Sequence, residues 1–270
     1  MTQSSPTPLL RIRNLSTGYA SRREGKVVSS GLCAELQLGT LTALIGVNGT
    51  GKSTLLRTLA ALQRPLAGSV EWGGRDVRTL SVREVARTVA VVLTERTDAG
   101  GLTVEEVVRL GRLPHGTFAS RMADEDRAVV ERVMQTVGVS QWRARRLSSL
   151  SDGERQRVMI ARALAQQTPA ILLDEPTAFL DFPAKVALMQ LLQRLAHEEG
   201  KTVLFSTHDL ELAFQTADGL WLLSPDGLVC GTPERLAADG TIGRFFAADA
   251  TEFDARLLRF NLSFGKGRDI

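Results

Sequence analysis

The chain contains 270 residues, enough for one large domain or for one domain that carries an inserted lobe. Hydrophobic residues make up 43% and charged residues 23% of the sequence, which excludes a collagen-like, low-complexity or wholly disordered chain. The formal net charge is +3, and the densest basic patch, residues 143–146, is too short to indicate nucleic-acid binding. No apolar run has the roughly 18 residues of a membrane-spanning helix, and the first residues do not resemble a signal peptide, so we expect a soluble, cytoplasmic protein.

Strand-sized and helical segments alternate along the chain. Strands are expected at residues 9–14, 31–37, 41–45, 69–72, 89–93, 170–173, 203–205 and 220–223, and a helix at residues 52–62. Because strands that alternate with helices form parallel sheets, this order predicts an α/β fold with a mostly parallel sheet covered on both faces. Cys33 and Cys230 form no CxxC pattern, and we expect both to be small core residues.

Helical signals continue without an intervening strand between residues 99 and 150. Thr103 and Glu106 form a capping box at the start of one helix, and residues 123–137 predict a second helix. We therefore expect a helical lobe, residues 99–150, inserted in one α/β core made of residues 1–98 and 151–244. Residues 245–270 form a C-terminal extension, in which residues 257–262 alternate as in a hairpin.

A glycine-rich loop follows the strand expected at residues 41–45 and leads into a helix. It matches GxxxxGK[ST], in which glycines let backbone N–H groups point at a phosphate while the helix N-terminus adds positive charge. Lys52 is placed to reach the β- and γ-phosphates of a nucleotide, and the Ser53 hydroxyl to bind Mg²⁺. The alternative is a glycine turn with a surface lysine. The candidate binding residues are Gly46, Asn48, Gly49, Thr50, Gly51, Lys52, Ser53 and Thr54.

Two adjacent carboxylates follow the strand expected at residues 170–173. Asp174 is placed to bind Mg²⁺, and Glu175, on the opposite side of the extended chain, to polarise an attacking water. The pair fits hydrolysis better than phosphoryl transfer to a small molecule. The alternative is a strand that ends in two solvated acids before a turn.

A second capping box, made of Ser151 and Glu154, opens another helix. The N–H groups of this helix start form a second candidate anion site, and Gly153 permits the close approach of a phosphate. By itself the stretch is an ordinary helix start.

These segments, together with Phe179-Leu180-Asp181 and Ser206-Thr207-His208-Asp209, resemble the ATPase subunits of ABC transporters in order and spacing. The resemblance covers residues 9–240. It implies a P-loop ATPase core with a mostly parallel sheet, an N-terminal antiparallel β portion and an inserted α-helical lobe. It also implies a head-to-tail homodimer, in which each ATP lies between the Gly46 to Thr54 loop of one copy and the Ser151 to Gln156 stretch of the other.

The same resemblance implies further roles for single residues. Glu175 is the general base, His208 contacts the γ-phosphate and the water, Asp181 signals across the dimer, and Tyr19 stacks on adenine. Thr94 stands where the family usually has a Gln that contacts Mg²⁺ or water. A Thr hydroxyl can bind a metal-bound water, but it is shorter than Gln. A second departure is an aspartate, residue 152, in place of the first glycine of the usual LSGGQ.

Residues 80–87 and 102–115 resemble the importer ATPases for iron–siderophore complexes, haem and cobalamin. This resemblance implies an ATP-hydrolysing subunit with ATP and Mg²⁺ as cofactors, held on the inner face of the cell membrane by separate permease subunits. A substrate-binding capture protein is an indirect partner, and nucleic acid is not a partner. The lobe and the loop at Thr94 would contact the permease. The alternatives are a soluble ABC-type ATPase that serves no transporter, and a P-loop kinase or nucleotide-binding module without turnover.

Overall fold

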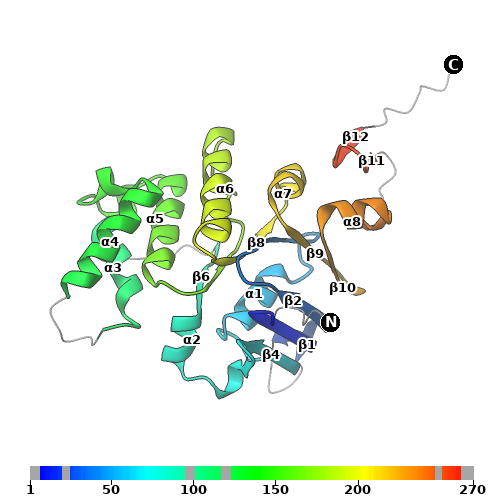
Figure 1. Cartoon of the computed structure of the whole chain (residues 1–270), viewed down its shortest axis with the longest axis horizontal. Coiled ribbons are helices and arrows are strands. Elements are labelled where there is room, and N and C mark those ends of the chain that lie inside the picture. Colours follow the sequence, from blue (N-terminus) through cyan, green and yellow to red (C-terminus); the bar gives the residue numbers. More distant parts are fainter. Residues whose placement is uncertain (1–6, 20–24, 95–100, 117–122, 247–250, 263–270) are drawn as a thin grey trace, which may run out of the picture.

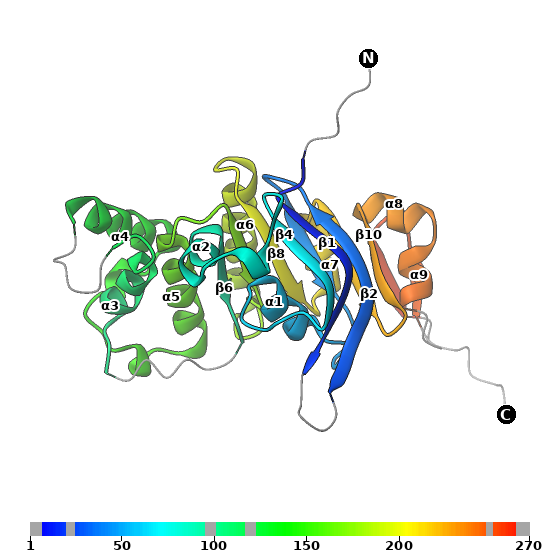
Figure 2. The same cartoon turned by 90° about the horizontal axis from the view of Figure 1, so that it is seen from below.

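The computed structural model describes residues 7–19, 25–94, 101–116, 123–246 and 251–262. These residues form two large sheets, a group of helices beside them and a short C-terminal hairpin (Figure 1). Seen from below, the helices α3 and α4 lie at one end of the molecule and α8 and α9 at the other, with the sheets between them (Figure 2). None of the described helices is long and apolar enough to cross a membrane.

The central sheet has six strands in the order β10-β9-β3-β8-β7-β6. Neighbouring strands run parallel except at the β10 edge, which pairs antiparallel with β9, so the predicted mostly parallel sheet is confirmed. The carboxyl ends of β3, β7 and β8 therefore lie side by side at one edge, where open α/β sheets bind their ligands. The strands are β3 Leu41–Ile45, β6 Val89–Val92, β7 Ala170–Leu173, β8 Thr202–Thr207, β9 Gly219–Ser224 and β10 Gly227–Gly231.

A second, antiparallel sheet has the order β2-β1-β4-β5 and confirms the predicted N-terminal antiparallel portion. Its strands are β1 Leu10–Tyr19, β2 Lys26–Leu36, β4 Ala67–Trp72 and β5 Arg75–Asp76. The first two are longer than predicted, because register shifts in their pairing interrupt the apolar alternation on which the prediction depended. The helix α1, Lys52–Leu59, shares one hydrophobic core with this sheet and with one face of the central sheet.

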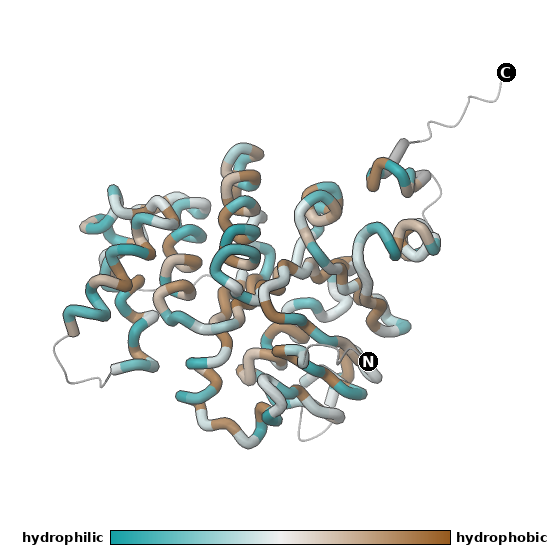
Figure 3. Tube along the Cα trace, viewed as in Figure 1, coloured by the Kyte–Doolittle hydropathy of each residue, from teal (hydrophilic) through white to brown (hydrophobic). Residues whose placement is uncertain are grey.

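The other face of the central sheet packs against helices that alternate with its strands. These are α5 Asp152–Ala165, α6 Phe182–His197 and α7 Leu210–Thr216. In Figure 3, α6 alternates apolar and hydrophilic residues along its length, as expected of a helix that packs on one side. A short helix, α2 Val82–Thr88, precedes β6.

Residues 99–150 contribute helices to the same core. They contain α3 Val104–Arg109, α4 Asp124–Val137 and short 3₁₀ turns, and no strand among the part that is described. The capping boxes predicted at Thr103 and Ser151 are both present. The hydrophobic core continues from the sheet through α5 into α3 and α4. The division of the chain at residues 99, 151 and 245 stays a prediction.

The C-terminal part begins with α8 Pro233–Ala238 and α9 Thr241–Phe245. The alternation at residues 257–262 belongs to a hairpin in which β11 Thr251–Asp254 pairs with β12 Arg259–Leu262. The prediction that both cysteines lie in the core is wrong for Cys33, which is exposed on β2, whereas Cys230 on β10 is partly buried. On a strand with one solvated face, the residue's position in the alternation decides its burial, and Cys33 falls on the outer face.

Candidate active site

The glycine-rich loop leaves β3 at Ile45 and enters α1 at Lys52. Gly51, directly before the helix, has φ 100°, a left-handed conformation that disfavours any residue with a side chain. A Cβ atom there would also lie 2.4 Å from Val28 Cγ1, and one at Gly46 would lie 2.5 Å from the carbonyl oxygen of Leu223. The local fold therefore needs glycine at both positions, as the phosphate-loop pattern predicts.

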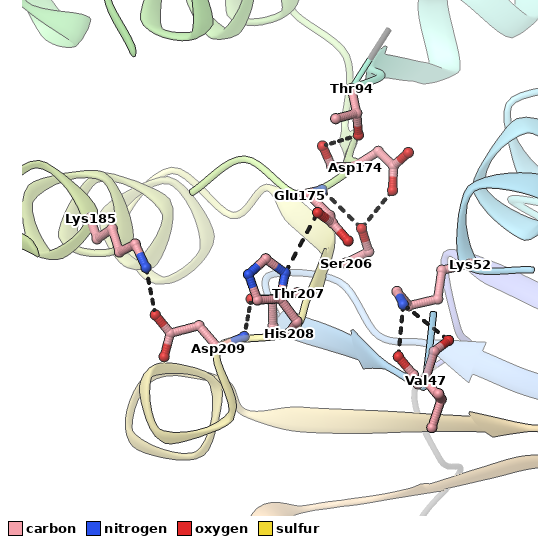
Figure 4. Close-up of polar contacts among 11 residues, drawn as sticks. Val47, Lys52, Thr94, Asp174, Glu175, Lys185, Ser206, Thr207, His208 and Asp209 are labelled. Carbon is pink, nitrogen blue, oxygen red and sulfur yellow. Dashed lines mark hydrogen bonds and ion pairs between the residues drawn. The ribbon is translucent and has the colours of Figure 1, made fainter. Parts of the chain in front are cut away.

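The side chain of Lys52 folds back onto the start of this loop. This side chain is buried, and Nζ donates to the carbonyl oxygen of Gly46 at 2.7 Å. Nζ also lies 3.4 Å from the carbonyl oxygen of Val47 (Figure 4). Burial lowers the pKa of Lys52, and the negative charges of Glu175 and Asp174 partly oppose this effect. The fold thus brings the predicted phosphate-binding lysine within electrostatic reach of both predicted acids.

Asp174 follows β7 and is almost completely buried, with 3% of its surface exposed. Its Oδ1 accepts a hydrogen bond of 2.6 Å from the Ser206 hydroxyl at the end of β8. The Thr94 hydroxyl, two residues beyond the end of β6, donates to the backbone oxygen of Asp174 at 3.1 Å. Hydroxyls from β8 and from the segment that follows β6 therefore hold this residue (Figure 4).

Glu175 and His208 face each other across the same edge of the sheet. His208 Nδ1 lies 3.5 Å from Glu175 Oε2, and the imidazole is 60% exposed while the carboxylate is 25% exposed. Beyond them, Lys185 on α6 forms an ion pair of 3.0 Å with Asp209. A partly buried carboxylate paired with an open imidazole is suited to move a proton to or from a molecule bound at this edge.

The stretch that opens α5 is built as a capped helix N-terminus. The Ser151 hydroxyl accepts from the Glu154 N–H, and the Glu154 carboxylate accepts from the Ser151 N–H. A Cβ atom at Gly153 would lie 3.2 Å from the carbonyl oxygen of Phe179, so this glycine allows the segment before α6 to come close. Asp181 caps α6, accepting from the N–H of residue 184 at 2.9 Å.

Neither Ser151 nor Glu154 makes a hydrogen bond or ion pair with the glycine-rich loop within the described ranges. The fold brings together the loop, the two acids, Thr94 and His208, whereas the capping hydrogen bonds of Ser151 run to Glu154.

Tyr19 ends β1 beside the start of α1. Its hydroxyl lies 3.4 Å from that of Thr54, and its side chain is 53% exposed. An open pocket of about 310 Å³ adjoins it, lined by Gly18, Tyr19, Arg57, Leu62, Gln63, Arg64 and Leu93. The ring is therefore placed next to the glycine-rich loop with space beside it for a planar group.

The residues present fit a magnesium ion that arrives with a nucleotide. Among the described residues, no three His, Cys, Asp or Glu side chains gather into a protein-held metal site. Mg²⁺ does not require such a cage, since it is usually bound by one or two carboxylates together with substrate phosphates and waters. Asp174 offers one carboxylate whose Oδ1 is already oriented, and Ser53 lies next to Lys52 in the first turn of α1.

Sequence reasoning missed one residue that the site uses. Ser206 belongs to the motif that contains His208, yet no role was predicted for it. Its signal in the sequence is a serine that ends an apolar run, and this signal gives no hint of which strand lies beside it.

The model of the ABC transporter family matches residues 30–178, more than half of the chain. The chain belongs to the family of ABC transporter ATPases. It is 39% identical over 204 residues to the iron(3+)-hydroxamate import ATP-binding protein FhuC of Bacillus subtilis, covering 76% of this chain and 74% of that one. It is 37% identical over 238 residues to the ferric enterobactin transport ATP-binding protein FepC of Escherichia coli, covering 88% and 86%.

Solved ABC cassettes have the same fold. A dimeric cassette in a post-hydrolysis state, bound to ADP and phosphate, superimposes with a TM-score of 0.72 at 27% identity, covering 83% of this chain and 98% of that one. An ATP-binding subunit of another ABC transporter gives a TM-score of 0.75 at 25% identity, covering 89% and 95%. This ABC transporter ATPase is therefore an ATP-binding and ATP-hydrolysing protein with the cassette fold.

Proposed function

We propose that this ATPase powers the import of an iron chelate, haem or cobalamin through separate membrane permease subunits. The observation that carries the hydrolytic part is the Glu175 and His208 pair, 3.5 Å apart at the sheet edge that also holds Lys52. The names of the relatives support the cargo class. FhuC and FepC are named for ferric chelates, and a cobalamin import protein, BtuD of Halobacterium salinarum, is 41% identical over 234 residues, covering 86% of this chain and 58% of that one.

The glycine-rich loop and Lys52 hold the phosphates of ATP in this proposal. Backbone N–H groups of the loop and of the α1 N-terminus would bind the phosphates, and the Lys52 ammonium would balance charge on the β- and γ-phosphates. Ser53 and Asp174 would hold Mg²⁺, with Thr94 contacting a metal-bound water, and the ion would neutralise charge on the phosphates.

Glu175 is the general base and accepts a proton from the attacking water. Its carboxylate is the less exposed member of the pair, and His208, being open, is free to contact the γ-phosphate. We therefore assign the proton-transfer role to the less exposed Glu175 and a binding role to the open His208.

A second copy of the chain completes each site. Among the residues that the structure describes, Ser151 and Glu154 make no polar contact with the loop, and a helix N-terminus is suited to bind a phosphate presented from outside. We place Ser151, Gly153 and Glu154 of one copy against the ATP held by the other, with Asp181 at the shared boundary and Tyr19 stacked on adenine. The dimeric cassettes among the solved relatives support this arrangement.

We also infer the partners of this chain and its location in the cell. Residues 99–150, inserted in the core of residues 1–98 and 151–244, and the loop at Thr94 would contact the permease on the inner face of the membrane. A substrate-binding capture protein delivers cargo from the other side. The names of the relatives, all import or transport subunits, favour this assembly over a soluble ATPase that serves no transporter.

Two variants test the hydrolytic roles. Glu175→Gln removes the general base and should lower kcat about 10²- to 10⁴-fold while ATP still binds and holds a dimer in size-exclusion chromatography. Lys52→Ala should lose ATP binding. Glu198→Gln, an exposed carboxylate at the end of α6, is the matched control and should leave both properties unchanged. An unchanged hydrolysis rate in Glu175→Gln would contradict the assignment.

The cargo is tested with the permease pair expressed from neighbouring genes. The assembled complex, with its capture protein, is assayed for ATP hydrolysis in the presence of ferric siderophores, haem or cobalamin. Stimulation by one of them supports import and identifies the cargo. Failure to purify with any permease, combined with hydrolysis that responds to a soluble partner, would support the soluble alternative.

A further inference from the structure

Ser206 lies between the strand that carries the phosphate loop and the strand that carries the two acids. In β8 it is opposite Leu44 of β3, and its neighbour Phe205 is opposite Leu173 of β7. Side chains alternate across a sheet, so Ser206 shares a face with Leu204, whose side chain lies in the core under α1. Asp174 lies on the same face, because it is two residues after Leu172, whose side chain is in the same core. The hydroxyl and the carboxylate thus meet on the side of the sheet where Lys52 begins its helix.

The Ser206 hydroxyl is completely buried and makes two hydrogen bonds of opposite kind. It donates to Asp174 Oδ1 at 2.6 Å and accepts from the backbone N–H of Glu175 at 2.9 Å. A single hydroxyl has one proton to donate and lone pairs to accept with, so both capacities are used. One side chain therefore contacts both predicted acids.

The first bond orients the Asp174 carboxylate. A hydrogen bond to an ionised group is short and roughly twice as strong as one between neutral groups. It fixes the rotation of the carboxylate through Oδ1. Carboxylates that hold a metal depend on such outer contacts for their orientation.

The second bond supports a strained backbone. Glu175 has φ 46°, a left-handed conformation that is strained for a residue with a side chain. The preceding residue, Asp174, still continues the parallel hydrogen-bond ladder, because its N–H donates to the Val92 carbonyl. The N–H of Glu175 does not continue this ladder. Ser206 Oγ accepts that N–H instead, and the bond keeps the Glu175 side chain directed toward His208.

We propose that Ser206 is a positioning residue that sets the geometry of both Asp174 and Glu175 through one buried hydroxyl. The proposal rests on the hydrolytic roles given to these two acids above. Ser206 touches neither nucleotide nor metal in this scheme. It acts by aligning the metal-holding carboxylate with the general base.

The test compares Ser206→Ala with Thr202→Val in the full-length chain. Thr202 lies on the same strand, is equally buried and donates to the Gln37 carbonyl at 3.0 Å, so its variant loses a buried hydroxyl far from the site. ATP binding is titrated calorimetrically at increasing Mg²⁺ and also in its absence. We expect Ser206→Ala to raise the Mg²⁺ concentration for half-maximal tightening of ATP binding about 10- to 100-fold and to lower kcat by a similar factor. Metal-free ATP affinity should stay within about threefold, because Lys52 and the loop are intact, and Thr202→Val should change none of these values.

Hydrogen exchange on the unmodified chain gives a second measurement that does not depend on a variant. The Glu175 amide should be strongly protected, because its N–H is bonded to a buried hydroxyl. Exchange as fast as in an open loop would overturn the proposal, as would an unchanged Mg²⁺ dependence in Ser206→Ala or an equal shift in Thr202→Val. These outcomes differ from failure of the proposed function, in which Glu175→Gln would hydrolyse ATP at the parent rate.

Discussion

Arg112 is predicted to be the strongest single polar anchor between the helices of residues 99–150 and α5. Its side chain is 10% exposed and donates to Asp126 Oδ1 at 2.7 Å. The same guanidinium donates to the carbonyl oxygen of Ala165 at 2.7 Å and to Gln167 Oε1 at 2.8 Å. It therefore ties the turn after α3 to the first turn of α4 and to the end of α5.

Arg112→Met keeps most of the apolar stem of the side chain and removes its charge. Asp126, with 18% of its side chain exposed, then stays partly buried without its cation. Breaking a buried pair by removing one partner costs about 3–5 kcal/mol, and the remaining exposure of Asp126 places the expected loss of unfolding free energy near the lower end, about 3 kcal/mol. Two further acceptors, the Ala165 carbonyl and the Gln167 side chain, lose their donor as well.

The assay is urea unfolding of the full-length chain, followed by circular dichroism. Arg127→Met is the matched control, from α4, the helix that carries Asp126; Arg127 pairs with Asp124 at 3.3 Å, and their side chains are 51% and 97% exposed. An exposed pair contributes about 0.5 kcal/mol or less, so this variant should unfold at nearly the same urea concentration as the parent. A loss below about 1 kcal/mol in Arg112→Met, or equal losses in both variants, would refute the reasoning.

Two further predictions concern ionisable groups. In Glu175→Gln the pKa of Lys52 should fall below its already lowered value, because one of the two carboxylates that raise it is gone, and a rise in an NMR titration of the lysine side chain would contradict this. At neutral pH a thiol reagent should modify exposed Cys33 and leave Cys230 unmodified, because burial raises the pKa of the Cys230 thiol to about 12 and the thiolate is the reactive form. Equal labelling rates in mass spectrometry would show that Cys230 is accessible.

Local signals account for what the sequence could predict. The central strands are short apolar runs, and the capping boxes at Thr103 and Ser151 depend on residues three positions apart, so both can be recognised without knowledge of the fold. The glycine-rich loop is likewise a contiguous pattern. The pattern requires glycine at Gly51, where the structure has φ 100°, so the backbone conformation at this position can be predicted from the sequence.

Features that depend on which strands are neighbours could not be predicted in the same way. Ser206 meets Asp174 only because β8 pairs with β7 in one register, and the two residues are far apart in the chain. The strand β10 was missed because its apolar run is only three residues long, 228–230, and stands between two glycines; the strand forms at the sheet edge by pairing with β9. Cys33 was misplaced because a cysteine's usual burial says nothing about which face of β2 it occupies.

The position of β3 in the central sheet has a consequence for the order in which the protein acquires its activity during synthesis. β3, at Leu41–Ile45, leads into the glycine-rich loop, yet its two sheet neighbours are β8, Thr202–Thr207, and β9, Gly219–Ser224. A nascent chain therefore carries the loop long before the strands that flank it emerge from the ribosome. Since contacts between distant segments form only after the intervening chain is available, the loop should become competent to bind a nucleotide only when about four fifths of the chain has been made. A truncated product that ends before Thr202 would contain the whole phosphate-binding motif and still fail to bind ATP.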